Sequence, residues 1–89
     1  MERAILKSVD YKCELLKVNF HYGKPIGKAK IPASYVLKSN ATNLFHVELA
    51  NRWRMQYSTF EGDMGEVIVY IQDISSHPDY DKKFKYRSR

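Results

Sequence analysis

The sequence predicts an α+β domain in which an N-terminal helix, with a short second helix, packs on one face of a small antiparallel β-meander. The long helix is predicted because apolar residues near the N-terminus recur at helical spacing. The meander is predicted because three later runs are rich in β-branched and aromatic residues and are separated by turn residues. A chain of 89 residues supports one domain with a modest core, so residues 1–89 are assigned to a single domain.

The N-terminal helix is predicted from Met1 to about His21. Steps of four, four, three and four residues place on one helical face Ile5, Val9, Cys13, Leu16 and Phe20. Gly23 and Pro25 follow and are expected to end the helix. Because Cys13 lies on the apolar face, we interpret it as a small buried hydrophobe rather than a reactive thiol.

Residues 24–30 show no apolar period and are predicted to form a loop that carries three lysines. Proline is tolerated in the first turn of a helix, so a short helix is expected from Pro32 to about Lys38. The polar residues 39–42 then connect this helix to the sheet.

The three predicted strands cover residues 43–49, 53–60 and 67–74. Strand alternation directs toward the N-terminal helix the side chains of Phe45, Val47, Leu49, Trp53, Met55 and Tyr57. The opposite face, which we expect to stay wet, carries His46, Glu48, Arg54 and Gln56. The third strand is apolar on both sides, so we expect it to be the central or best covered strand of the sheet.

The chain is basic, with a formal net charge of +5 and a pI of about 9.4. This balance favours a polyanion or an acidic protein as partner, although many small proteins are basic for solubility alone. One cysteine excludes an intrachain disulfide and fits the reducing cytoplasm, and no apolar run has the length of a membrane span. The histidines and the cysteine lack metal-ligand spacing, so neither a metal nor a cofactor is expected.

Three segments carry a resemblance to a known family. The segment N-L-F-H-V-E-L-A-N-R-W-R-M-Q-Y resembles the central strands of the RelE/ParE toxin superfamily, where an aromatic-Arg-x-x-Tyr strand is typical. The tail H-P-D-Y-D-K-K-F-K-Y resembles the C-terminal end of archaeal RelE-like and HigB-like members. The segment K-P-I-G-K-A-K-I-P-x-x-Y is similar to the basic loop before the sheet in archaeal members.

The resemblance implies helices on one face of a twisted antiparallel sheet. It also implies a toxin of a type II toxin–antitoxin pair that enters the ribosomal A site and cuts mRNA without a metal. The partners would be a cognate antitoxin, the ribosome and mRNA, in a homodimer or a toxin–antitoxin hetero-oligomer. The family usually begins with a strand, whereas the helix here starts almost at Met1, so the first strand is expected to be missing or very short.

Metal-free RNA cleavage needs a base for the 2′-hydroxyl, positive charge on the phosphate and an acid for the leaving oxygen. Arg54 matches the strand arginine of the family and is the predicted phosphate clamp; the alternative is a solvated arginine on the sheet face. His77 and Tyr80 are the predicted proton-transfer pair, or they cap and pack a short helix. Glu48 is a candidate base, or it balances Arg54 across the strands.

Contacts to the RNA are predicted for a set of basic residues, namely Lys28, Lys30, His46, Arg52, Lys82 and Lys83. Two other functions fit the same sequence. One is a non-catalytic protein on the RelE/ParE fold, either a gyrase inhibitor or an inactive toxin relic, which the missing first strand favours. The other is a basic ribosome-associated structural protein, which explains the charge but not the order of the motifs. The His-x-x-Tyr tail favours cleavage.

Overall fold

The chain folds as an α+β domain, as the sequence predicts. The computed structural model describes residues 2–27, 30–31, 33–39 and 42–76. Its elements in chain order are α1 (Arg3–Val18), β1 (Lys24–Pro25), α2 (Ala33–Ser39), β2 (Phe45–Glu48), the 3₁₀ turn η2 (Ala50–Arg52), β3 (Arg54–Glu61) and β4 (Val67–Ser75). In the described part of the chain no strand precedes α1. None of the helices in these residue ranges is long and apolar enough to cross a membrane.

The sheet has four strands in the order β1-β2-β3-β4, and each neighbouring pair is antiparallel. The predicted meander is therefore confirmed, with strand ends within two residues of the expected ones. The prediction of a simple loop over residues 24–30 is wrong at its start, because Lys24 pairs with His46 and Pro25 with Phe45. Two residues with no alternation of their own give no strand signal in the sequence, so only the pairing reveals β1.

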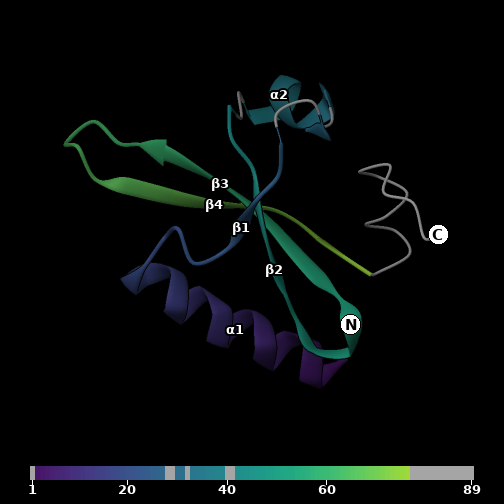
Figure 1. Ribbon diagram of the computed structural model, residues 1–89. Coiled ribbons are helices and arrows are strands. Elements are labelled where there is room, and N and C mark those ends of the chain that lie inside the picture. Colours follow the sequence, from purple (N-terminus) through teal and green to yellow (C-terminus); the bar gives the residue numbers. More distant parts are fainter. Residues whose placement is uncertain (1, 28–29, 32, 40–41, 77–89) are drawn as a thin grey trace.

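Helix α1 packs on one face of the sheet (Figure 1). Its apolar stripe joins the strands in a core of Ile5, Leu16, Val47, Leu49, Met55 and Tyr57, against which Val9, Cys13 and Trp53 also pack. The predicted helix-facing side chains all belong to this core or pack against it, so this prediction is confirmed for Phe45, Val47, Leu49, Trp53, Met55 and Tyr57. The helix ends at Val18, so Phe20 lies in the turn that follows.

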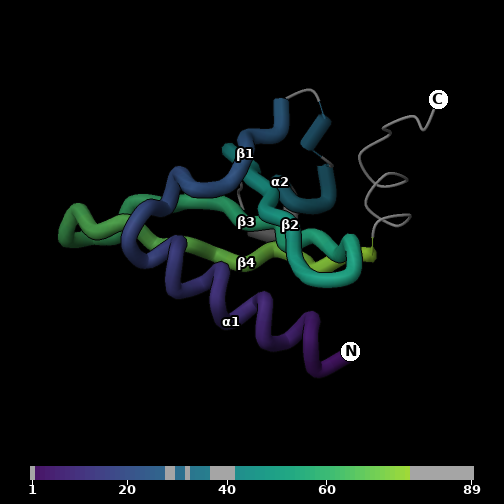
Figure 2. Tube along the Cα trace, turned by 60° about the horizontal axis from the view of Figure 1, so that its bottom comes forward, coloured from purple at the N-terminus to yellow at the C-terminus, as the bar shows by residue number. Residues whose placement is uncertain are grey.

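The short helix α2 lies on the opposite side of the sheet from α1, as Figures 1 and 2 both show. The prediction that both helices share one face is therefore wrong. The reason is a second apolar cluster of Ile26, Tyr35 and Leu44, with Ile31 and Phe60 packed against it. Leu44 and Phe60 are apolar residues on the face away from α1. Burying them requires a second set of apolar side chains packed on that face.

On the face away from α1, Gln56 is buried, although we expected it to stay wet. Gln56 and Ser58 are fully buried, and each takes part in side-chain hydrogen bonds. Ser58 Oγ donates to the carbonyl oxygen of Asn43 at 2.7 Å and accepts from Gln72 Nε2 at 3.1 Å. Ser75 Oγ donates to Gln56 Oε1 at 3.1 Å. The bonds from Gln72 and Ser75 link β4 to β3, and the bond to Asn43 ties β3 to the segment just before β2.

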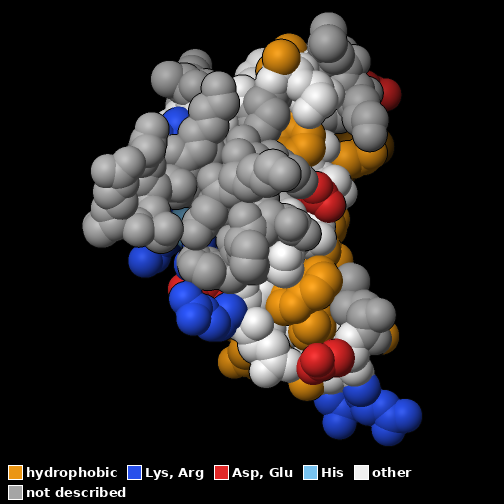
Figure 3. All heavy atoms as spheres, turned by 90° about the vertical axis from the view of Figure 1, so that its right-hand side faces the viewer, with side chains coloured by type: hydrophobic (Ala, Val, Ile, Leu, Met, Phe, Trp, Pro, Cys, Tyr) orange, Lys and Arg blue, Asp and Glu red, His pale blue; other side chains and the backbone are white. Residues whose placement is uncertain are grey.

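Strand β4 lies at the edge of the described sheet, so the prediction that it is central or best covered is wrong. Its large apolar side chains Val67, Ile68, Tyr70 and Ile71 are exposed. In a meander the last strand pairs only with the one before it, and apolar character on both faces does not reveal this order. Figure 3 shows hydrophobic side chains at the surface of the described atoms on one face of the molecule.

Candidate nucleic-acid interface

Two polar residues of the predicted site lie opposite each other, one on β2 and one on the neighbouring strand β3. Glu48 is the register partner of Arg54, and Arg54 Nη2 lies 3.6 Å from Glu48 Oε1. The Arg54 side chain is 22% exposed and that of Glu48 72%, so the guanidinium is the better shielded partner. An ion pair with one well-exposed partner contributes little to stability. Its main effect is to orient the guanidinium of Arg54.

His46 lies on the same face, two residues before Glu48 on β2. Its side chain is half-buried, and burial is the largest reason why its pKa is lowered from the ordinary value of 6.5. The positive charges of Arg54 and Lys24 lower this pKa further, while Glu48 acts weakly in the opposite direction. The imidazole is therefore neutral at pH 7 and can accept a proton.

An open pocket of about 360 Å³ adjoins His46. It is lined by Lys12, Tyr22, Gly23, Lys24, His46, Val47 and Glu48. β1 pairs only with Phe45 and His46. The next two residues of β2, Val47 and Glu48, have no pairing partner in β1, and they line the pocket. Two lysines and one glutamate line it, so the pocket carries net positive charge.

Helix α1 and the turn after it contribute two side chains that hold each other in this pocket. Lys12 Nζ donates to Tyr22 Oη at 3.2 Å and lies 5.1 Å from the centre of the Tyr22 ring. Lys12, Tyr22 and Lys24, which line this pocket, are not among the residues predicted from the sequence for the site. Lys12 and Tyr22 are ten residues apart, and no helix or strand periodicity in the sequence connects them. Only the pairing of β1 with β2 brings them to the site.

The other residues predicted for the site are not part of the group formed by His46, Glu48 and Arg54. Lys30 and Arg52 are both exposed, and Arg52 lies in η2 between β2 and β3. Five other predicted residues lie outside the described residues, namely Lys28, His77, Tyr80, Lys82 and Lys83. Of the predicted site, the structure thus brings together His46, Glu48 and Arg54.

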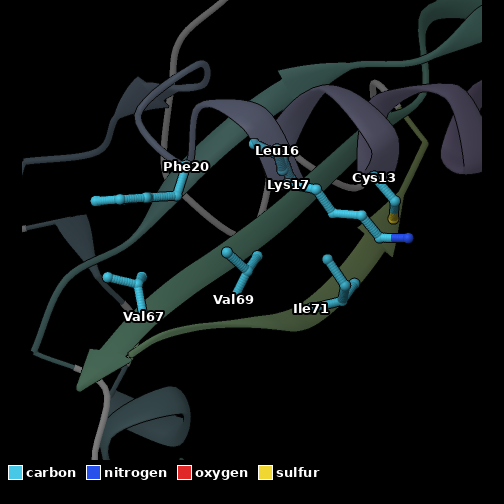
Figure 4. A pocket seen from close by; sticks show the side chains of 7 residues that line it. All are labelled: Cys13, Leu16, Lys17, Phe20, Val67, Val69 and Ile71. Carbon is cyan, nitrogen blue, oxygen red and sulfur yellow. The ribbon is translucent and has the colours of Figure 1, made fainter. Parts of the chain in front are cut away.

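A second and larger cavity of about 510 Å³ lies between α1 and β4. It is lined by Cys13, Leu16, Lys17, Phe20, Val67, Val69 and Ile71. Figure 4 shows the three β4 side chains on one wall and the α1 side chains on the other. Its one charged lining residue, Lys17, pairs with Glu14 at 2.9 Å, so this cavity lacks the cationic character of the first.

In the described ranges, no group of three or more His, Cys, Asp or Glu side chains is placed to hold a metal ion. No protein-family model, curated protein or solved structure matches the chain.

Proposed function

We propose that the chain is a RelE/ParE-like toxin that cuts mRNA on the ribosome without a metal. The observation that carries this proposal is the convergence of Arg54, Glu48 and a neutral His46 beside a cationic pocket. This set contains a group that binds phosphate and a group that accepts a proton, which are two of the three requirements of the reaction.

In the proposed reaction, His46 takes the proton of the ribose 2′-hydroxyl, and the 2′-oxygen attacks the adjacent phosphorus. The bond from phosphorus to the 5′-oxygen breaks, which leaves a 2′,3′-cyclic phosphate and a 5′-hydroxyl. The leaving 5′-oxygen takes a proton from His77 or Tyr80, the pair that the sequence predicts for this role. Arg54 stabilises the charge that grows on the phosphate oxygens during attack.

Glu48 is better suited to orient Arg54 than to act as the base. Its carboxylate is directed to the guanidinium, at 3.6 Å. A guanidinium has five N–H donors, so it can hold a carboxylate and a phosphate oxygen at the same time. The neutral imidazole of His46 accepts a proton without giving up an ion pair, which makes it the preferred base.

The proposal includes the partners implied by the family resemblance. A toxin of this type pairs with a cognate antitoxin and acts on ribosome-bound mRNA in the cytoplasm. The net charge of +5 supports attraction to RNA and to an acidic antitoxin. A homodimer and a toxin–antitoxin hetero-oligomer are both compatible with β4, which is the edge strand among the described residues and has exposed apolar side chains.

The second candidate is a non-catalytic protein on the same fold, either a gyrase inhibitor or a toxin relic. The Glu48–Arg54 ion pair favours it, because cross-strand pairs of opposite charge occur in sheets without any catalytic role. In this case the basic pocket binds nucleic acid or an antitoxin and no bond is broken.

Two parallel assays separate the candidates. The purified chain is added to a reconstituted translation reaction, and mRNA ends are mapped with and without ribosomes. The same preparation is added to a DNA gyrase supercoiling assay. Ribosome-dependent cuts that leave 5′-hydroxyl ends support the toxin, whereas gyrase inhibition with intact mRNA supports the second candidate.

A further inference from the structure

Three elements present hydrogen-bond donors to the pocket beside His46. Lys12 comes from α1, Tyr22 from the turn after it, and Lys24 from β1. The residue between the last two, Gly23, is buried against β2 and β3. A Cβ atom at Gly23 would lie 2.7 Å from Tyr57 Oη and 2.9 Å from the carbonyl oxygen of His46. This close approach fixes where Tyr22 and Lys24 meet the sheet.

We infer that this pocket is a second phosphate subsite, which binds a phosphodiester group of single-stranded RNA next to the one that Arg54 holds. The identity of the ligand as RNA rests on the proposed function. The subsite itself rests on the pocket and its donors.

The donors suit a phosphate. Lys12 has three N–H donors and gives one to Tyr22 Oη, so the hydroxyl hydrogen of Tyr22 is directed elsewhere and can reach a ligand oxygen. The Tyr22 ring holds the Lys12 ammonium through a cation–π contact. The Lys12 side chain therefore loses less conformational freedom when a ligand binds. Both cations are lysines, which bind phosphate as point charges, whereas a planar carboxylate is better matched by arginine.

Glu48 places the subsite close to Arg54, because it lines the pocket and its Oε1 lies 3.6 Å from Arg54 Nη2. Lys24 and Arg54 both lower the pKa of His46, which agrees with this arrangement. Glu48 also lines the pocket, but its carboxylate is directed to Arg54, which offsets its repulsion of an anion. One RNA strand can therefore contact the pocket and Arg54 together.

The test measures binding of a single-stranded 2′-O-methyl RNA, which cannot be cleaved, by fluorescence anisotropy at several salt concentrations. Lys12→Gln should weaken binding at least fivefold at low salt and reduce the slope of log affinity against log salt by about 0.7. Tyr22→Phe should weaken it by about threefold through loss of one hydrogen bond. Lys7→Gln is the matched control, because Lys7 is an exposed α1 lysine outside the pocket lining.

An equal loss in Lys7→Gln and Lys12→Gln would overturn the subsite and leave only general attraction to positive charge. Unchanged binding in Lys12→Gln and Tyr22→Phe, with both variants folded by circular dichroism, would overturn it too. Polyglutamate that binds with the same dependence on Lys12 and Tyr22 would assign the pocket to an acidic peptide and reject the RNA ligand.

The test separates the subsite from the proposed function. If the wild-type chain binds the modified RNA through Lys12 and Tyr22 but never cuts mRNA, the subsite stands and the toxin proposal fails. If the chain cuts mRNA but neither substitution changes binding, the toxin proposal stands and the subsite fails.

Discussion

The hydroxyl of Tyr57 accepts a hydrogen bond from the backbone N–H of Gly23 at 2.9 Å, across 34 positions of the chain. The same hydroxyl donates to the carbonyl oxygen of Phe20 at 2.9 Å. Burial raises the pKa of Tyr57, so the hydroxyl stays protonated and keeps its donor. One side chain of β3 thus fixes the turn after α1 on the sheet and, with it, the wall of the basic pocket.

Tyr57→Phe should lower the free energy of unfolding by about 1–3 kcal/mol, because it leaves a backbone N–H and a carbonyl oxygen without their partner. Urea unfolding measures the change. Tyr70→Phe is the control, since Tyr70 is 50% exposed and should tolerate the same change. Equal stability of the two variants would show that the Tyr57 hydroxyl does not hold the turn.

Gly23→Ala should also destabilise the fold, by roughly 1–3 kcal/mol, because the new methyl group meets the Tyr57 ring and forces the turn away from β2. Gly27→Ala is a close control, because a Cβ atom at Gly27 meets nothing within 4 Å. Thermal unfolding of both variants gives the comparison. A Gly23→Ala protein as stable as Gly27→Ala would contradict the close packing at the turn.

His46 should couple stability to pH. The pKa of His46 in the folded chain lies below its ordinary value of 6.5. At a pH between these two values, the unfolded chain therefore binds more protons than the folded one. Stability from this residue is therefore complete above about pH 6.5 and is lost as the pH falls toward the folded pKa. Urea unfolding from pH 7.5 to 5 should show this loss, and His46→Gln should reduce it.

Nuclear magnetic resonance titration of the His46 ring tests the cause directly. Lys24→Met should raise the pKa of His46 only in part, because burial is the larger cause of the shift. Lys7→Met should leave it unchanged. A His46 pKa above its ordinary value in the wild-type chain would contradict the neutral imidazole on which the proposed mechanism depends.

Cys13 should react slowly with iodoacetamide at pH 7. Burial and the charge of Asp10 raise the pKa of its thiol, and the thiolate is the reactive form. The half-buried sulfur lies in the cavity between α1 and β4. The rate should be several-fold below that of glutathione under the same conditions. A rate equal to that of glutathione would contradict the raised pKa.

The local parts of the fold could be predicted from the sequence because their signals are local. The helix follows from the spacing of Ile5 and Leu16, which are both buried. The choice of which side chains of β2 and β3 face α1 follows from strict alternation along the strands. Alternation places Met55 and Tyr57 in the core and Arg54 opposite Glu48. Three of the predicted site residues meet for the same reason.

The remaining features depend on contacts between distant residues, which no local period encodes. Strand β1 exists only through its pairing with Phe45 and His46. The face chosen by α2 depends on the cluster that Tyr35 forms with Ile26 and Leu44, and the Tyr35 hydroxyl also donates to the Asp73 carboxylate at 3.3 Å. The edge position of β4 depends on strand order, and the pocket depends on the return of Lys24 to the sheet.

In the proposed mechanism, Arg54 stabilises a phosphate during RNA cleavage. The most direct measurement is the rate of mRNA cleavage in a reconstituted translation reaction, with 5′-hydroxyl ends mapped, for the wild type and Arg54→Ala. We expect ribosome-dependent cuts whose rate falls about a hundredfold or more in Arg54→Ala. The Lys7→Ala control should keep its rate, and Arg54→Ala should keep its circular dichroism spectrum. Cleavage by Arg54→Ala at the wild-type rate would contradict the account.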